Sequence, residues 1–305
     1  MRAVWSFWYH PVRVRGSRWG NILYDLSSWV LSVETTRQHY DECVLYADDM
    51  GRYILVDLLQ LPFTEVYPLN VGKEEERFWA LGKLHAFRQQ EAPFFHIDSD
   101  VYLWKRLPER LENAPILVER IEDFYPTDRF SFYKPELVEH VIGDQGYLPE
   151  EWKWYRRSRK KLKTASCGIV GGENLDFFRY FTEVAIEFAH HPDNESLWSK
   201  IPKEVDLNVL YEQFLLCACN EYRNRRTGTK SSKVTRIEPL FLPSEDPFFP
   251  GMAAERGYTH VAARAKQNDS IKERLLHRVR RDYPDSYEKC LVASQLKESR
   301  DTGHY

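Results

Sequence analysis

The chain has 305 residues, of which 29% are charged, and a formal net charge of −3 at pH 7. A chain of this length can bury a sizeable core, and a net charge so near zero supplies no general attraction to nucleic acid or anionic lipid. The five cysteines are too few, and odd in number, for a disulfide framework. The N-terminus lacks the apolar run and cleavage site of a signal peptide, and nothing predicts a transmembrane segment. We therefore expect a cytoplasmic protein with no nucleic-acid partner.

Strand and helix patterns alternate through the first hundred residues. Short apolar runs predict strands at residues 3–8, 43–46, 65–69 and 94–97. Helical spacing predicts helices at residues 24–38, 54–59 and 74–90, and residues 47–51 have the composition of a turn. This alternation favours an α/β fold with a mixed, mainly parallel sheet flanked by helices.

The second half of the chain is less regular. Strands are predicted at residues 116–119, 166–172 and 238–242, and helices at 175–190 and 206–221. No period persists over residues 122–163, and residues 222–235 and 243–251 are predicted loops. A charged helical stretch covers residues 269–296. Because no repeat or low-complexity linker interrupts the pattern, we expect one α/β domain over residues 1–268 and a C-terminal helical extension over 269–305.

The main chemical signal is a pair of aspartates after a buried strand. The apolar run at residues 94–97 has too little polar alternation for an exposed strand, and it ends at Asp98 and Asp100. Open α/β sheets bind ligands at the carboxyl ends of their strands, and two such carboxylates can hold one divalent cation. That cation can neutralise a diphosphate, the leaving group in sugar transfer. The alternative is a capping or turn pair.

The segment around this pair resembles a known superfamily. Residues 95–101, FHIDSDV, are similar to the hydrophobic strand and D-x-D-V of GT-A-type nucleotide-diphospho-sugar transferases. The resemblance extends along most of the chain and is closest to a poorly characterised bacterial group. It implies a GT-A-like fold and hexosyl transfer from a nucleotide-diphosphate sugar, with a UDP-sugar as the favoured donor. It also implies that Asp98 and Asp100 bind Mn²⁺ or Mg²⁺ and that Asp98 faces the donor. The acceptor stays open between a saccharide, a peptide and a small molecule.

Other segments resemble the same superfamily. Residues 45–48, LYAD, are similar to its second strand, and residues 166–172, SCGIVGG, to its N-A-G-I-x-G strand, with Ser-Cys in place of Asn-Ala. In that superfamily the helix before the D-x-D pair often carries a basic residue that binds the phosphates. The resemblance implies this role for Lys83. Glu212 and Gln213 resemble an acidic-glutamine pair that lies near the donor or acceptor sugar, and they are the catalytic candidates. A solvated helix face is the alternative for this pair.

A further pattern stands near the C-terminus. Residues 260–266, HVAARAK, resemble the H-x-x-G-x-x-K of a retaining GT-A group. In that group the histidine is the third metal ligand and the lysine binds the diphosphate, which implies these roles for His260 and Lys266 and favours retention. Ala263 replaces the glycine of the pattern, where backbone approaches phosphate. Imidazole and carboxylate suit Mn²⁺ or Mg²⁺, and a compact ammonium suits phosphate.

Two side chains at predicted strand ends are additional donor-binding candidates. The resemblance implies that Asp48 contacts the base or ribose and that a base stacks on Trp8. For Asp48 a turn or helix-capping role is the favoured alternative. For Trp8, core packing is equally favoured.

One stretch of the chain is locally basic. Residues 152–161, WKWYRRSRKK, interleave aromatic side chains with lysine and arginine. We interpret residues 153–163 as a solvated loop, or as a surface that binds an anionic acceptor, donor phosphates or, peripherally, a membrane.

Metal-dependent glycosyl transfer is the function that these patterns favour, but two alternatives stay open. The first is a phosphatase of the haloacid-dehalogenase type, whose nucleophile motif is also a strand followed by D-x-D. That motif usually opens its domain, whereas 97 residues precede Asp98 here. The second is a non-catalytic binding protein that keeps the nucleotide-sugar fold, since a fold does not determine a function.

Overall fold

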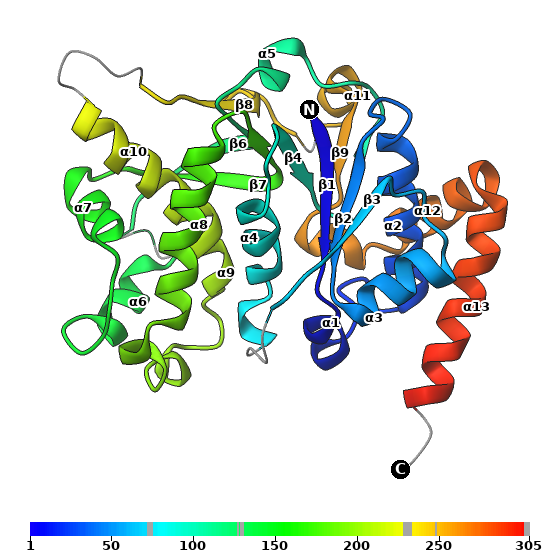
Figure 1. The fold of residues 1–305 in the computed structure, drawn as a ribbon, viewed down its shortest axis with the longest axis horizontal. Coiled ribbons are helices and arrows are strands. Elements are labelled where there is room, and N and C mark those ends of the chain that lie inside the picture. Colours follow the sequence, from blue (N-terminus) through cyan, green and yellow to red (C-terminus); the bar gives the residue numbers. More distant parts are fainter. Residues whose placement is uncertain (72–75, 127, 129–130, 228–233, 248, 302–305) are drawn as a thin grey trace. The chain divides into compact units, whose positions relative to one another are not determined.

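Seven strands form one mixed sheet in the computed structural model, which describes residues 1–71, 76–126, 128, 131–227, 234–247 and 249–301 (Figure 1). Their spatial order is β3-β2-β1-β4-β7-β6-β8. The pairs β1–β2, β2–β3 and β6–β8 are parallel, and β6–β7 is antiparallel. The predicted mixed, mainly parallel sheet is therefore confirmed. The strands are β1 (Arg2–Phe7), β2 (Cys43–Ala47), β3 (Glu65–Pro68), β4 (Phe94–Ile97), β6 (Ile116–Phe124), β7 (Leu162–Gly172) and β8 (Ile237–Phe241).

The chain divides into two units. The first consists of residues 1–76, 95–107 and 246–305, and the second of residues 77–94 and 108–245. The domain predicted over residues 1–268 and the extension over 269–305 stay predictions, and residues 302–305 lie outside the described residues.

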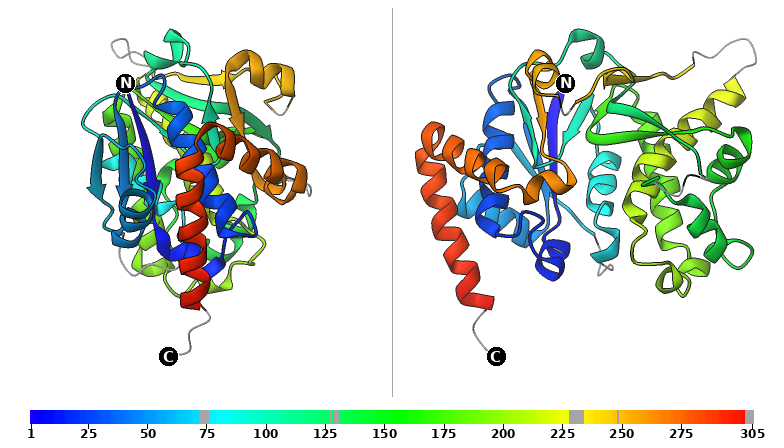
Figure 2. Two further views of the ribbon diagram at one scale, coloured as in Figure 1. Left: turned by 90° about the vertical axis from the view of Figure 1, so that its right-hand side faces the viewer. Right: turned by 180° about the vertical axis from the view of Figure 1, so that it is seen from behind.

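Helix α2 (Ile22–Thr36) is central to the first unit. Its predicted apolar face, Leu26, Trp29, Val30 and Val33, is buried, and the Asn21 side chain caps its N-terminus by accepting from the Leu23 N–H. Helices α12 (Asp269–Asp282) and α13 (Pro284–Asp301) pack against α2 (Figure 2). The predicted helical tail is thus confirmed but broken in two, because a proline cannot continue the hydrogen-bond ladder of α12.

Several short elements of the first unit were not predicted. Helix α1 (Tyr9–Arg15) follows β1, α3 (Asp49–Arg52) begins inside the predicted turn at residues 47–51, and α11 (Pro250–Arg256) begins inside a predicted loop. Strands β5 (Val101–Leu103) and β9 (Tyr258–His260) form a separate antiparallel sheet. Three-residue strands are too short for a periodic pattern to reveal.

Strands β6, β7 and β8 belong to the second unit together with several helices. Helix α8 (Leu175–His190) has the predicted bounds and contacts α4 (Leu81–Arg88). The predicted helix at residues 206–221 is divided into α9 (Leu207–Val209), a π-helical turn (Leu210–Phe214) and α10 (Leu215–Thr227). The remaining helices are α5 (Glu109–Glu112), α6 (Pro135–Ile142) and α7 (Glu150–Ser158).

Two predicted boundaries and one region described as irregular need correction. The helix predicted over residues 74–90 is α-helical over Leu81–Arg88, and residues 72–75 lie outside the described residues. The loop predicted over residues 222–235 is helical as far as Thr227, and residues 228–233 are not described. Part of the irregular region 122–163 is helical in α6 and α7.

Within the described part of the chain, no helix has the length and apolar character needed to cross a membrane.

A substitution at Gly172 would test the packing of β7 in the second unit. The φ of Gly172 is +145°, and an added Cβ would lie 2.2 Å from the carbonyl oxygen of Pro115. We expect Gly172→Ala to lower the free energy of unfolding by about 3–5 kcal/mol, because backbone strain adds to the clash. The control is Gly16→Ala, where φ is +78° but a Cβ meets open space, with an expected loss of about 1–2 kcal/mol. Equal losses in denaturant titrations would contradict the packing argument.

Candidate metal site

The two aspartates lie where the order of the strands reverses. The chain runs from β1 outward to β2 and β3, and β4 then returns to the other side of β1. Ser6 near the end of β1 is hydrogen bonded to His96 near the end of β4, so both strands finish at the same edge. In open α/β sheets this is the position at which ligands bind.

The small β5–β9 sheet adds a histidine to the aspartates. The Val101 N–H donates to the Asp98 carbonyl at 3.0 Å, and Val101 then pairs with His260 across the sheet. The Val261 N–H donates to the Asp100 carbonyl at 2.9 Å. As a result, one ligand atom each of Asp98, Asp100 and His260 lie within 4.8 Å of one another. The structure therefore brings together all three residues predicted as metal ligands.

Lys266 joins the same cluster. Its ammonium forms an ion pair with Asp100 Oδ2, and His260 Nε2 lies 3.5 Å from Asp100 Oδ1. Burial alone would raise the pKa of the Asp100 carboxyl, but the positive charge of Lys266, then that of His260, holds it well below its usual range. Asp100 is therefore a carboxylate at neutral pH, the form in which it can ligate a metal.

Serines of helix α2 hold the backbone that carries the aspartates. The Ser28 hydroxyl donates to the Ser99 carbonyl at 2.8 Å, and the Ser32 hydroxyl lies 3.4 Å from the Asp98 carbonyl. Ser32 also accepts from the Trp5 indole at 3.0 Å. The sequence analysis missed these residues, although polar side chains on the buried face of an apolar helix were a usable signal.

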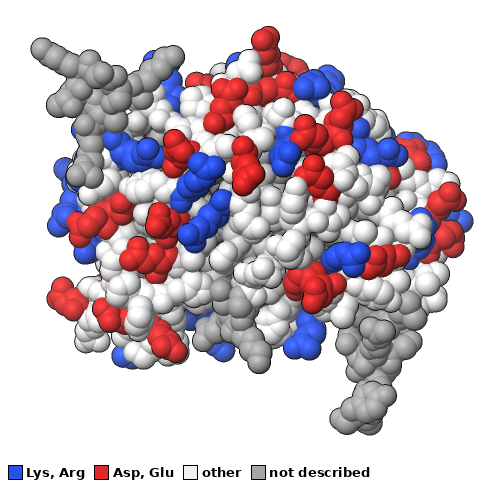
Figure 3. Space-filling view, in the orientation of Figure 1, with Lys and Arg blue, Asp and Glu red and all other residues white. Residues whose placement is uncertain are grey.

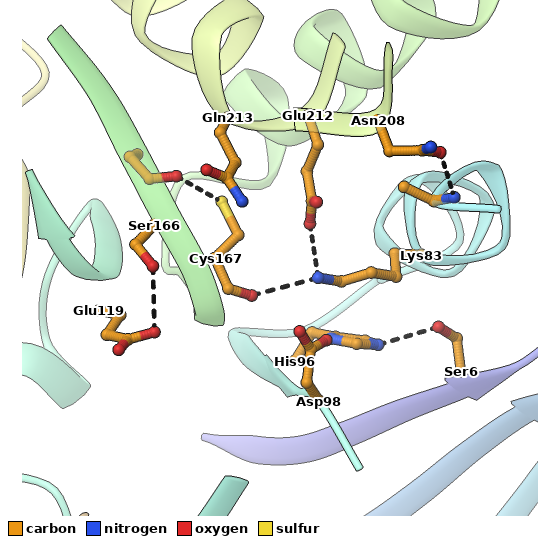
Figure 4. Close-up of polar contacts among 12 residues, drawn as sticks. Ser6, Lys83, His96, Asp98, Glu119, Ser166, Cys167, Asn208, Glu212 and Gln213 are labelled. Carbon is orange, nitrogen blue, oxygen red and sulfur yellow. Dashed lines mark hydrogen bonds and ion pairs between the residues drawn. The ribbon is translucent and has the colours of Figure 1, made fainter. Parts of the chain in front are cut away.

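His96 is a second omission. Its ring is buried, with Nε2 at 2.9 Å from Ser6 Oγ and Nδ1 at 3.8 Å from Asp98 Oδ1 (Figure 4). A side chain in this position limits the orientations open to the Asp98 carboxylate. The signal in the sequence was a single polar residue inside an otherwise apolar strand.

The donor atoms suit a divalent cation. Two carboxylates supply hard, charged oxygens, and an imidazole supplies a nitrogen that first-row metals accept. Asp100 is buried, whereas Asp98 and His260 are partly accessible. The residues therefore fit a divalent cation, and the choice of Mn²⁺ or Mg²⁺ stays a prediction.

Asp48 and Trp8 also belong to the first unit, and contacts within that unit account for much of their surroundings. The Asp48 carboxylate accepts from the Gly51 N–H at 2.7 Å and from the Tyr9 N–H at 2.9 Å, so it caps helix α3. Trp8 is buried and stacks on His10. The predicted cap is confirmed, and contacts of either residue with a nucleotide stay predictions.

Lys83, Glu212 and Gln213 lie in the second unit, in a polar network of their own (Figure 4). The Lys83 ammonium is 2.6 Å from Glu212 Oε1 and donates to the Cys167 carbonyl at 3.2 Å. Glu212 is 1% exposed, so the alternative of a solvated helix face is wrong for it. The Tyr133 hydroxyl lies 2.8 Å from Gln213 Oε1. The phosphate-binding role of Lys83 and the catalytic role of Glu212 and Gln213 stay predictions.

The basic segment is not the loop that we expected. Residues 150–158 form α7, because Trp152 and Tyr155 share a buried face. Four of the seven cations of residues 153–163 form ion pairs with acidic side chains of the second unit. Figure 3 shows both signs of charge intermixed on the face it displays. This local balance weakens the case for an anionic ligand or membrane at residues 153–163. The pairs are Lys153–Glu150, Arg156–Glu139, Arg159–Glu221 and Lys161–Asp123.

Ala263 occupies an unusual backbone conformation. Its φ is +46°, in the left-handed region that glycine enters without penalty, at the start of the 3₁₀ helix Ala263–Gln267. This is the residue that stands in the glycine position of the H-x-x-G-x-x-K pattern. The chain thus keeps a glycine-like backbone here although it carries a methyl group.

We expect Ala263→Gly to raise the free energy of unfolding by about 1 kcal/mol, because it removes the left-handed strain. The matched control is Ala262→Gly, at a residue with φ of −80°, which should lower it by about 0.5–1 kcal/mol through greater freedom of the unfolded chain. Denaturant titration measures both. A loss of stability in Ala263→Gly would be evidence against strain at this residue.

Comparison with known proteins gives a family but no activity. A family of unknown function (DUF6734) matches residues 1–293, and the chain belongs to it. No curated protein matches the chain. The argument for a function therefore depends on the geometry of the site.

Proposed function

We propose that this protein is a metal-dependent glycosyltransferase that uses a nucleotide-diphosphate sugar, with a UDP-sugar as the favoured donor. The observation that supports the proposal best is the convergence of Asp98, Asp100 and His260 with Lys266 at the end of β4. Two anionic ligands, an imidazole that is neutral once it binds a metal, and a nearby ammonium suit a metal that shares its ligand sphere with phosphate oxygens.

The chemistry that such a site favours follows from its charges. In sugar transfer the bond between the anomeric carbon and a diphosphate oxygen breaks, and a bond to an acceptor oxygen forms. A bound divalent cation supplies Lewis-acid stabilisation of the departing diphosphate. Asp98 and Asp100 would hold that cation, and the Lys266 ammonium would offer a compact positive charge to the oxygen that becomes anionic.

The resemblance to GT-A-type transferases supports the same proposal. The spacing from His260 to Lys266 matches the family pattern, and the backbone of Ala263 has the conformation of a glycine. Retention of anomeric configuration is the outcome that this pattern favours. Glu212 and Gln213 are the proposed catalytic candidates, and the acceptor is a saccharide, a peptide or a small molecule.

The proposal includes a cytoplasmic location. All five cysteines, which lie among the described residues, are buried thiols. Reduced thiols are typical of proteins in a reducing compartment. Burial also raises the pKa of the Cys217 thiol to about 12, so this side chain behaves as a small apolar group.

Metal binding is the first test of the site. We expect Asp100→Asn and His260→Ala each to weaken Mn²⁺ binding by about ten- to a hundredfold, because each removes a ligand. Calorimetric titration measures the affinity. The control is Asp49→Asn, an exposed acid that lies outside the cluster and should leave the affinity unchanged. Since Asp100→Asn leaves the Lys266 ammonium without its carboxylate, His260→Ala serves as the less disruptive variant. Unchanged binding in both variants would exclude this metal site.

Nucleotide binding is the second test. A thermal shift with UDP, GDP, CDP and ADP, each with and without Mn²⁺, should show stabilisation by one nucleotide that requires the metal. A ligand at 100 times its dissociation constant adds about 2.7 kcal/mol to the free energy of unfolding, a shift of a few degrees. Lys266→Ala should weaken binding of the nucleoside diphosphate more than that of the nucleoside. Absence of any metal-dependent shift would favour the phosphatase or a non-catalytic protein.

A further inference from the structure

The connection between helix α7 and strand β7 is short and basic. It consists of Arg159, Lys160 and Lys161, all of them exposed. The buried Tyr155 fixes its far end, because the hydroxyl accepts from the Lys163 N–H at 2.9 Å and donates to the Lys163 carbonyl at 3.1 Å. The connection therefore presents its cations from a defined backbone.

Ion pairs neutralise part of this charge. Arg159 and Lys161 lie 2.7 Å and 2.9 Å from carboxylates of the second unit. Lys160 and the nearby Arg157 are exposed and form no ion pair with any acidic side chain that the structure describes. Two cations thus stay available to a partner, but charge alone is a weak indication in a segment where most cations are paired.

Exposed aromatic side chains lie at the same end of these strands. Strands β6 and β7 are antiparallel with Phe124 opposite Leu162, so Tyr125 leaves β6 beside the basic connection. The Phe132 ring lies 5.7 Å from that of Tyr133, which lies 5.1 Å from the Phe124 ring. Tyr125 is 52% exposed, and Phe132, at 65%, is the most exposed large apolar side chain among the described residues. Apolar surface and unpaired cations therefore occur together at this end of β6 and β7.

This combination suits the surface of an anionic bilayer. Lysine and arginine are attracted to acidic head groups, and aromatic rings enter the boundary between the head groups and the acyl chains. Single-stranded nucleic acid also binds cations and aromatic rings, but it favours a charged groove that follows its backbone. Here the four cations fall within residues 157–161, and the Phe132 ring has no hydrogen-bonding group. A compact group of this kind fits a flat surface better than a strand.

We propose that residues 157–161, together with Tyr125 and Phe132, bind the protein peripherally to a membrane that carries anionic phospholipids. Of the interpretations open for the basic segment, the two exposed aromatic side chains select this one. The inference goes beyond the proposed function and does not depend on it, because these residues belong to the second unit and none is a ligand in the proposed metal site.

Cosedimentation of the full chain with vesicles tests the electrostatic part. Wild type should bind vesicles of phosphatidylcholine and phosphatidylglycerol, bind phosphatidylcholine alone far more weakly, and lose binding as salt shortens the Debye length from about 10 Å to about 3 Å. Lys160→Ala should weaken binding about fivefold, the effect of one cation near an anionic surface. The matched control is Lys203→Ala, another exposed lysine of the second unit without an ion pair among the described residues, which should change binding by less than about twofold.

The same assay tests the apolar part. Phe132→Ala should weaken binding to the anionic vesicles by about tenfold, because the ring would no longer leave water. Phe249→Ala is the control, since Phe249 is 62% exposed but belongs to the first unit, and it should bind like wild type. The unfolding temperature without vesicles checks that each variant folds.

Each outcome decides the proposal. Losses in Lys160→Ala and Phe132→Ala, with both controls unchanged, support it. Absence of vesicle binding, equal binding to both kinds of vesicle, or variants that match their controls would overturn it. Binding of single-stranded oligouridylate in place of vesicles would assign this surface to nucleic acid and also overturn it. None of these results alters the metal and nucleotide titrations, so the proposed function is judged separately.

Discussion

The antiparallel pairing of β5 with β9 is the interaction on which the candidate site depends. It joins segments about 155 positions apart in the chain and sets His260 opposite Val101, next to Asp100. A ladder three residues long is weak by itself, so its neighbours have to stabilise it. Buried side chains of Val101, Leu103 and Tyr258 do so, as does the hydrogen bond from the Trp104 indole to Thr259 at 3.0 Å. The site is thus a product of long-range packing.

The fold was largely predictable because its main elements bury continuous apolar faces. Strand β4 was visible as a short, mostly apolar run, and helix α8 was found with its observed bounds from periodicity alone. Prediction failed where the signal was short or mixed. Helix α7 was missed because Lys and Arg surround its two buried aromatic side chains, and β5 and β9 are too short for any period to repeat.

The site was predictable in its residue types but not in its connections. The two aspartates could be named from their position after a buried strand, and His260 and Lys266 from the resemblance to H-x-x-G-x-x-K. The structure brings these four together. The pairing of Lys83 with Glu212 could not be foreseen, because nothing in a sequence states which buried charge neutralises which. The serines of α2 and the histidine of β4 were also missed, since hydrogen bonds to a backbone turn or a carboxylate leave no spacing pattern.

The ion pair between Lys266 and Asp100 also bears on how two ligands would share the site. A divalent cation that uses Asp100 competes with an ammonium already tethered to the chain, which acts as a competitor at high effective concentration. Once displaced, that ammonium can turn to an incoming anion, which lowers the cost of displacing it. For the proposed metal and diphosphate, each would therefore increase the affinity of the other, and thermodynamic linkage requires the two increases to be equal. Such a protein would bind a free metal ion weakly and its metal–diphosphate complex tightly.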